Sequence, residues 1–253
     1  MKNRLNQIIF FMFLILCIQA CSVKQSDIKS VAQTNSATQI EEFKTEILKD
    51  LIIYKKKLDL RNPNAYNKEL QPSIIYQINL KQDYLNLIQN GKTLENYNEY
   101  FYYAFSPENI SNRNDLLILG LYKLIFKAFS MDKNHQFTAV QYNKQEMLVL
   151  YEYLQVVRWK IKTAKDNKAE YLFKTWQNNW QLELAKKYEG DFNIINDLTY
   201  IKENKESVFD SSNFSFEIVL SKIIANVEHT LRKINVEPYE MGVSALKGFI
   251  FIL

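Results

Sequence analysis

Apolar residues recur along most of this chain at the spacing of amphipathic α-helices. Between residues 40 and 54 they fall on one helical stripe. The residues of this stripe are Ile40, Phe43, Ile47, Leu51 and Tyr54. Proline or glycine, flanked by Asn, Ser or Asp, interrupts the pattern at Pro63, Pro72, Gly91, Pro107, Gly190 and Pro238. The pattern predicts helices joined by short polar connections.

The same spacing predicts further helices after this first one. Their ranges are 74–88 (opened by Pro72), 111–130, 143–167, 169–188, 191–204 and 214–235, and the apolar end 242–253 is expected as a last core helix. The stretch from Leu116 to Phe129 is apolar on nearly every side, which is typical of a central, buried helix. Lys123 and Lys127 interrupt it, so a membrane span is not expected there.

The composition supports this all-α interpretation. Among 253 residues there are only five Gly and four Pro, too few for the many turns of a β fold. Hydrophobic residues make up 47% of the chain, as in an ordinary globular protein. No repeat is visible that would indicate a solenoid. We therefore expect an all-α fold, a compact multi-helix bundle.

The net charge argues against a nucleic-acid partner. The formal charge is +4, and it falls to about +2 once Lys2 and Arg4 of the first twenty residues are subtracted. Nucleic-acid binding needs clustered cations that displace phosphate counterions, and a body so near neutral has no electrostatic footprint of this kind. We expect no nucleic-acid partner.

The first twenty-one residues have the pattern of an export leader. Lys2 and Arg4 are followed by an apolar core from Ile8 to Ile18, and Ala20 is a small residue at the expected cleavage position. At about 1.5 Å per residue the core spans roughly 16 Å, much less than the ~30 Å hydrocarbon layer of a bilayer. Such a core is suited to the export machinery and too short for a permanent span.

The end of this leader, Ile18-Gln19-Ala20-Cys21, resembles the lipobox of bacterial lipoproteins. The resemblance implies cleavage before Cys21, attachment of diacylglycerol to its sulfur and acylation of the new amino group. Two or three acyl chains are enough for stable membrane anchoring. The alternative is a plain signal peptide in which Cys21 is incidental.

The resemblance also implies a location in the cell envelope. Ser22 is not the aspartate that typically retains such proteins at the inner membrane, so we expect the outer membrane, facing the periplasm, if the cell has two membranes. Residues 22–39 are polar and small, which predicts a flexible tether reaching roughly 25 Å. The expected organisation is a signal peptide (1–20), a lipidated tether (21–39) and a single helical domain (40–253).

The residue types that carry common chemistry are scarce. After Cys21 there is no cysteine, which excludes disulfides and thiolate ligands from the folded body. His135 lies near Asp132 in a polar segment, and His229 follows Glu228 on a predicted helix. For His135 a solvated loop, and for His229 a partly buried or surface position, is a better explanation than a metal ligand. We expect no metal and no cofactor.

Two concentrations of aromatic residues are candidate binding surfaces. Six aromatic residues occur between Asn96 and Phe105, too many to face one core, so Tyr97, Tyr100 and Tyr102 are candidates for an exposed surface. Trp176 and Trp180 are four residues apart, so they share a helix face, beside several amide side chains. Core packing is the competing explanation for both groups.

These observations lead to one functional hypothesis and two alternatives. We expect a lipid-anchored, non-enzymatic module that binds a protein or a cell-wall component. The first alternative is an envelope hydrolase that uses acidic residues such as Asp115, Glu217 and Glu228. The second is a carrier of a lipid-like ligand, which predicts an enclosed cavity lined by Phe and Tyr. The oligomeric state is left open.

Overall fold

The structure, a computed structural model, describes residues 25–131, 144–175, 179–187, 189–203, 205 and 216–238. Several residues singled out above lie outside these ranges. They are Cys21, Asp132, His135, Trp176 and the segment 242–253. The expectations attached to them remain predictions.

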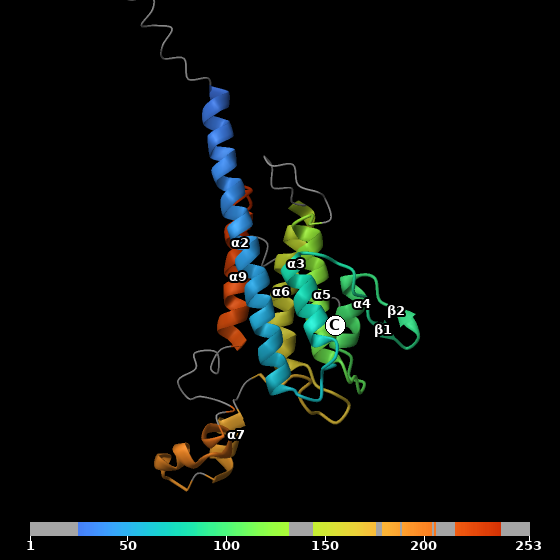
Figure 1. The fold of residues 1–253 in the computed structure, drawn as a ribbon, viewed down its shortest axis with the longest axis vertical. Coiled ribbons are helices and arrows are strands. Elements are labelled where there is room, and N and C mark those ends of the chain that lie inside the picture. Colours follow the sequence, from blue (N-terminus) through green and yellow to red (C-terminus); the bar gives the residue numbers. More distant parts are fainter. Residues whose placement is uncertain are drawn as a thin grey trace, which may run out of the picture.

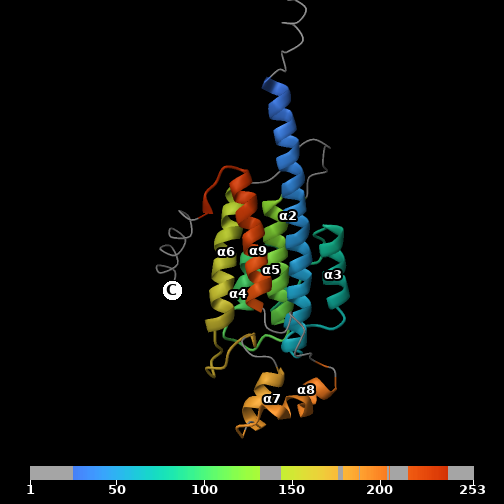
Figure 2. The same ribbon diagram turned by 90° about the vertical axis from the view of Figure 1, so that its left-hand side faces the viewer.

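Four long helices form the body of the protein (Figures 1 and 2). They are α2 (Gln25–Arg61), α5 (Arg113–Ala128), α6 (Lys144–Thr163) and α9 (Phe216–Lys233). Each packs on two of the others, in the cyclic order α2, α5, α6, α9. Successive helices run in opposite directions, because the end of each meets the start of the next. This is an up-and-down four-helix bundle, and it confirms the predicted all-α class.

Shorter elements cover one side of the bundle. Helix α3 (Gln71–Leu80) packs on α2 and α5, and α4 (Tyr97–Ala104) packs on α5. Between them lies a two-residue hairpin, β1 (Ile88–Gln89) paired antiparallel with β2 (Lys92–Thr93). Its turn, Asn90-Gly91, has positive φ at both residues, as a tight hairpin turn requires.

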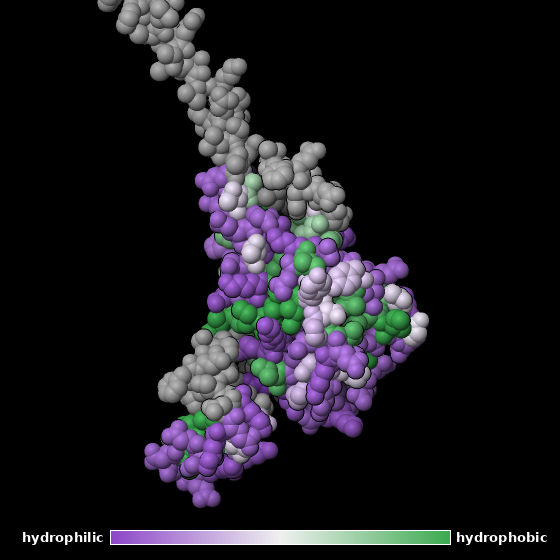
Figure 3. Space-filling model, in the orientation of Figure 1, coloured by the Kyte–Doolittle hydropathy of each residue, from purple (hydrophilic) through white to green (hydrophobic). Residues whose placement is uncertain are grey.

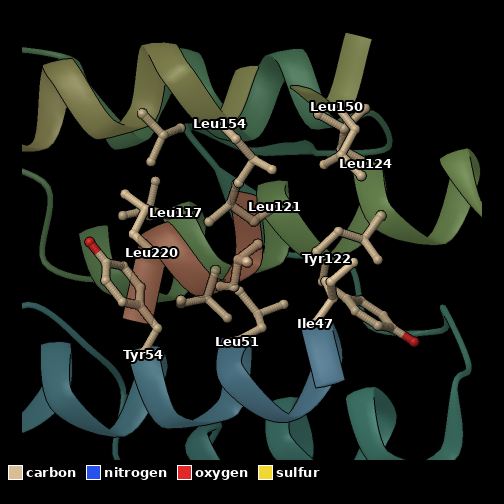
Figure 4. Packing of buried hydrophobic residues seen from close by; sticks show 14 of the residues in the cluster. Ile47, Leu51, Tyr54, Leu117, Leu121, Tyr122, Leu124, Leu150, Leu154 and Leu220 are labelled. Carbon is tan, nitrogen blue, oxygen red and sulfur yellow. The ribbon is translucent and has the colours of Figure 1, made fainter. Parts of the chain in front are cut away.

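The core is built from one face of each long helix (Figure 4). Ile47 and Leu51 of α2 face Leu117 and Leu121 of α5, while α6 and α9 close the other sides. Helix α5 is buried at every position from Arg113 to Ile125. The prediction of a central helix around Leu116 to Phe129 is therefore confirmed.

The predicted helix 74–88 is too long. Helix α3 ends at Leu80, because Lys81 takes a left-handed conformation (φ 55°) and its backbone N–H closes on the carbonyls of Gln77 and Ile78. The hydroxyl of Tyr122 donates to the carbonyls of Gln77 (3.1 Å) and Gln82 (2.7 Å), which holds the chain as it turns away. Ile88 consequently lies in β1.

The predicted helix 169–188 begins later than expected. Ala169 has a positive φ of 64°, and Asp166 Oδ1 accepts hydrogen bonds from the N–H groups of Lys168 and Glu170. These contacts form a compact turn after α6, and the described helix is α7 (Asn179–Lys187). Asp166 competes successfully with a helix for these backbone donors.

The predicted helix 191–204 is divided in two. The 3₁₀ helix η1 (Phe192–Asp197) and the short α8 (Thr199–Lys202) are separated by the extended backbone of Leu198. Glu183 of α7 accepts hydrogen bonds from the N–H groups of Thr199 and Tyr200 and so caps α8. Helices α7, η1 and α8 pack on one another and lie beyond the lower end of the bundle (Figure 2).

Residues 25–39 are helical where the sequence predicts a flexible tether. Helix α2 begins at Gln25 and continues into the bundle without interruption. Residues 22–39 contain neither Gly nor Pro. Once the bundle fixes the helix near Ile40, each added residue gains a hydrogen bond without the cost of nucleation. The helical part before Ile40 is about 22 Å long at 1.5 Å per residue.

Within the part of the chain that the structure describes, no helix is both long and apolar enough to cross a bilayer.

Candidate functional site

An open groove lies between α2 and α3, with a cavity volume of about 530 Å³. This volume lies within the range of roughly 300–1,000 Å³ that is usual for ligand sites. Helix α2 contributes residues spaced three and four apart, which are neighbours on one helix face. The lining residues are Thr45, Leu48, Lys49, Ile52, Ile53 and Lys56 from α2 and Ile75, Ile78, Asn79 and Lys81 from α3 and its end.

The floor of this groove is apolar and its rim is cationic. Leu48 and Ile78 are buried at the bottom, and Ile53 is 36% exposed at the edge. Three lysines, Lys49, Lys56 and Lys81, lie along the rim, and no lining residue is acidic. The groove therefore combines an apolar contact surface with positive charge.

Two polar contacts hold α3 against α2 at the two ends of the groove. At one end the ammonium group of Lys81 lies 2.8 Å from the carboxylate of Glu41. At the other end, the side-chain amide of Gln71 donates to Asp59. Because both ends are fixed, the groove is formed in advance of any ligand, which lowers the entropic cost of binding.

Glu41 also forms an ion pair with Lys44, whose side chain is only 1% exposed. Burial raises the pKa of Glu41, but the hydrogen bonds and charges of Lys44 and Lys81 outweigh it and hold the pKa below its usual value. Glu41 is therefore ionised near neutral pH and able to hold both lysines.

An exposed apolar stripe continues from the groove along α2. Leu60 is 74% exposed and lies seven residues, two helical turns, after Ile53. Figure 3 shows apolar residues among hydrophilic ones on the face where α2 and α3 lie. An apolar strip of this kind indicates a contact surface.

The structure places part of the predicted aromatic surface inside the protein. Tyr100 is fully buried, its hydroxyl accepts a hydrogen bond from the N–H of Leu87 at 2.9 Å, and burial raises its pKa to about 12. Tyr97 is half-buried against Phe101 and Tyr153. Tyr102 is 72% exposed. Trp180 is buried, and Trp176 lies outside the described residues. Tyr100 and Trp180 therefore cannot meet a partner in the folded protein.

Two of the three candidate acids of a hydrolase, Glu217 and Glu228, lie too far apart on α9 to act together. Glu217 and Glu228 are eleven residues apart on this helix, about 16 Å along its axis. Glycoside hydrolysis needs carboxyl groups roughly 5–9.5 Å apart. Glu217 pairs with Arg158 (3.0 Å) and Lys162, and Glu228 accepts from the hydroxyl of Tyr151 (3.1 Å).

Asp115 belongs instead to a buried ionic centre with Lys55 and Asp59. Lys55 and Asp115 have no exposed surface, and Asp59 is 2% exposed. The N–H of Asn67 donates to Asp115 (2.7 Å), and the amide of Asn114 donates to Asp59 (3.1 Å). Burial raises the pKa of Asp115, and the charge of Lys55 opposes the rise. Because these groups are closed to solvent, the centre joins elements of the fold and offers no entrance to a ligand.

His229 belongs to no metal site among the described residues, and His135 lies outside them. His229 is exposed and stacks on Phe43, with ring centroids 5.5 Å apart. No group of three or more possible metal ligands occurs within the described ranges.

The groove was not predicted from the sequence, although a signal for it exists. Ile52, Ile53 and Leu60 lie off the core stripe of the first predicted helix, together with Lys49 and Lys56. Apolar residues on the second face of an otherwise amphipathic helix indicate a second contact. The element that covers this face is α3, and its packing on α2 is a tertiary contact that the sequence pattern does not reveal.

Fold and site together define an all-α up-and-down bundle with a preformed, lysine-rimmed groove on its outer side. No family model, no curated protein and no solved structure matches this chain.

Proposed function

We propose that this protein is a membrane-anchored envelope lipoprotein whose helical bundle binds a partner in the groove between α2 and α3. The observation that carries the binding role is the groove itself, which is apolar at its floor, cationic at its rim and fixed at both ends. A preformed concave site with a few placed charges is typical of binding sites.

The anchoring half of the proposal is supported by the leader and the lipobox-like residues before Cys21. Helix α2 begins four residues after Cys21 and itself forms one wall of the groove. A single helix thus leads from Gln25 to the site. The groove residues of α2, Thr45 to Lys56, lie about 30–47 Å from Gln25 along the helix axis, which sets how far the site can stand from the membrane.

The anchor is tested by replacing the acylated residue. We expect wild-type protein to incorporate labelled palmitate and to pellet with membranes, and Cys21→Ser to lose both properties. Cys17→Ser is the matched control, since this residue leaves with the leader, and it should behave as wild type. Membrane pelleting and processing of Cys21→Ser at the same bond would contradict the anchor.

The binding role is tested with substitutions on the groove edge. The double variant Ile53→Ser/Leu60→Ser removes exposed apolar contacts, while Ile218→Ser removes a comparable one (54% exposed) on α9. After formaldehyde treatment of cells, we expect the groove variant to lose crosslinked complexes that wild type and Ile218→Ser retain. Identical complexes in all three proteins would contradict a role for the groove.

A further inference from the structure

We infer that the α2–α3 groove receives an amphipathic helix of an acidic partner protein. This inference rests on the proposed function and adds the chemical class of the partner. The apolar face of the partner helix would lie on the groove floor, and its Asp and Glu residues would meet the lysines of the rim.

The openness of the site indicates a macromolecular occupant. Thr45, Lys49, Lys56 and Asn79 are exposed although they line the groove. A small ligand in such a groove would keep one side in water, whereas small-molecule sites bury about 70–90% of their ligand. A protein segment continues beyond the groove and covers it from outside.

The spacing of the exposed apolar residues favours a helix over an extended strand. Ile53 and Leu60 are seven residues apart on one face of α2, two turns or about 10 Å along the axis. Apolar contacts repeated every seven residues are those of two helices packed side by side. Recognition of an amphipathic helix in an apolar groove is a recurring binding mode.

The charges of the rim select an acidic partner. Lys49 is 64% exposed and pairs only loosely with Glu46, at 3.4 Å, while Lys81 pairs with Glu41. Lys56 has no carboxylate partner among the described residues. Exposed pairs of this kind contribute little, so carboxylates of a partner can compete for Lys49 and are unopposed at Lys56, while Lys81 keeps its pair with Glu41 and adds positive charge to the rim.

The same charges disfavour a second copy of this chain as the occupant. A symmetric dimer through this face would place the lysines of one rim against those of the other. Like charges across an interface are strongly unfavourable.

The experiment is site-specific photocrosslinking in the cells that make the protein. Benzoylphenylalanine is placed at position Ile53 of the full chain and, as a control, at position Ile218 on α9. The crosslinked segment is then mapped by mass spectrometry. We expect position 53, and not 218, to crosslink to a segment with apolar residues spaced three and four apart and acidic residues beside them.

Charge reversal gives the second measurement. We expect Lys56→Glu to lower the yield of this crosslink roughly tenfold, because it adds repulsion on the rim. Lys168→Glu, an exposed position on the turn after α6, should leave the yield unchanged.

The outcomes separate the two proposals. A product that contains a lipid, a second copy of this chain or a segment without acidic residues overturns the inference, while the groove remains a binding site. A position 53 yield no higher than that of position 218 overturns both. A yield equally lowered by both lysine substitutions shows general electrostatic attraction and also overturns the inference.

Discussion

The ammonium group of Lys55 lies 2.8 Å from the carboxylate of Asp115, and neither side chain reaches solvent. Lys55 is near the end of α2, and Asp115 is in the first turn of α5. Asp59 pairs with the same ammonium group from one turn further along α2. The pair therefore fixes where two core helices meet, at the same end of the bundle where Gln71 begins α3.

Replacing Lys55 with methionine should destabilise the protein strongly. The change leaves Asp59 and Asp115 buried without their cation, and breaking a buried ion pair costs about 3–5 kcal/mol. The free energy of unfolding in urea measures the loss. Lys56→Met is the matched control, because Lys56 is exposed and should change stability by less than about 0.5 kcal/mol. Equal effects of the two substitutions would contradict a structural role for the buried pair.

The instability of Lys55→Met should decrease as the pH falls. Burial already raises the pKa of Asp115 against the opposing charge of Lys55, so removal of Lys55 raises this pKa further. A carboxyl whose pKa is higher in the folded than in the unfolded state binds more protons when folded, and stability then grows with acidity. The difference in unfolding free energy between Lys55→Met and wild type should be smaller at acid pH than at neutral pH. An equal difference at both pH values would contradict this.

The helical spacing of apolar residues was sufficient to predict α5, α6 and α9 closely. Where prediction failed, a local backbone feature overrode the pattern. Lys81 ends α3 in a left-handed conformation that a lysine seldom adopts, and Asp166 forms a turn in place of a helix start. Neither feature changes the apolar spacing, so the spacing could not reveal it.

The site was harder to predict than the fold. Exposed and buried aromatic residues look alike in a sequence, and Tyr100 proved to be a core residue with its hydroxyl bound to Leu87. Lys55 lies four residues after Leu51, on the apolar stripe, which was the available sign of a buried charge. The groove needed knowledge of where α3 packs, and a one-dimensional pattern does not contain it.

Gly120 allows α4 to approach α5 closely, and Gly120→Ala should destabilise the bundle. A Cβ at this position would lie 3.0 Å from the Cβ of Tyr100 and 3.2 Å from a ring carbon of Phe101. Overpacking costs about 1–3 kcal/mol, which outweighs the gain of about 1 kcal/mol in helix propensity. Urea unfolding should show a net loss, and the loss should shrink in a Phe101→Leu background, where ring atoms are removed. A net gain in stability would show that α4 can move away freely.

Glu99 should make the hairpin and α4 sensitive to acid. The hydrogen bond from Lys92, together with backbone donors at Glu95 and Asn96, lowers the pKa of Glu99 to about 2 from an ordinary value of 4.5. Because the folded pKa is the lower one, the stabilisation is complete above pH 4.5 and is lost as the pH falls toward 2. NMR titration of the Glu99 carboxyl carbon should give this low pKa.

Two variants separate the contact from the charge. Glu99→Gln should weaken the protein above pH 4.5 and match wild type near pH 2. Glu95→Gln removes the same charge from a neighbouring position but leaves the ion pair between Glu99 and Lys92 in place, so it should leave the hairpin intact. A weakening by Glu99→Gln that persists at low pH would point to lost packing in place of the ionised hydrogen bond.

The continuous helix from Gln25 into the bundle makes a prediction that a flexible tether does not. Proline at position 36 removes one backbone hydrogen bond and clashes with the preceding turn, so Ser36→Pro should break α2 before it enters the bundle. We expect a loss of helical circular dichroism and of amide protection before Ile40. The unfolding free energy of the bundle should change by less than about 0.5 kcal/mol, because the core begins at Ile40. An unchanged spectrum would show that residues 25–39 are not helical in solution and form a flexible tether. Unfolding of the bundle in the same variant would show that this segment contributes to the core.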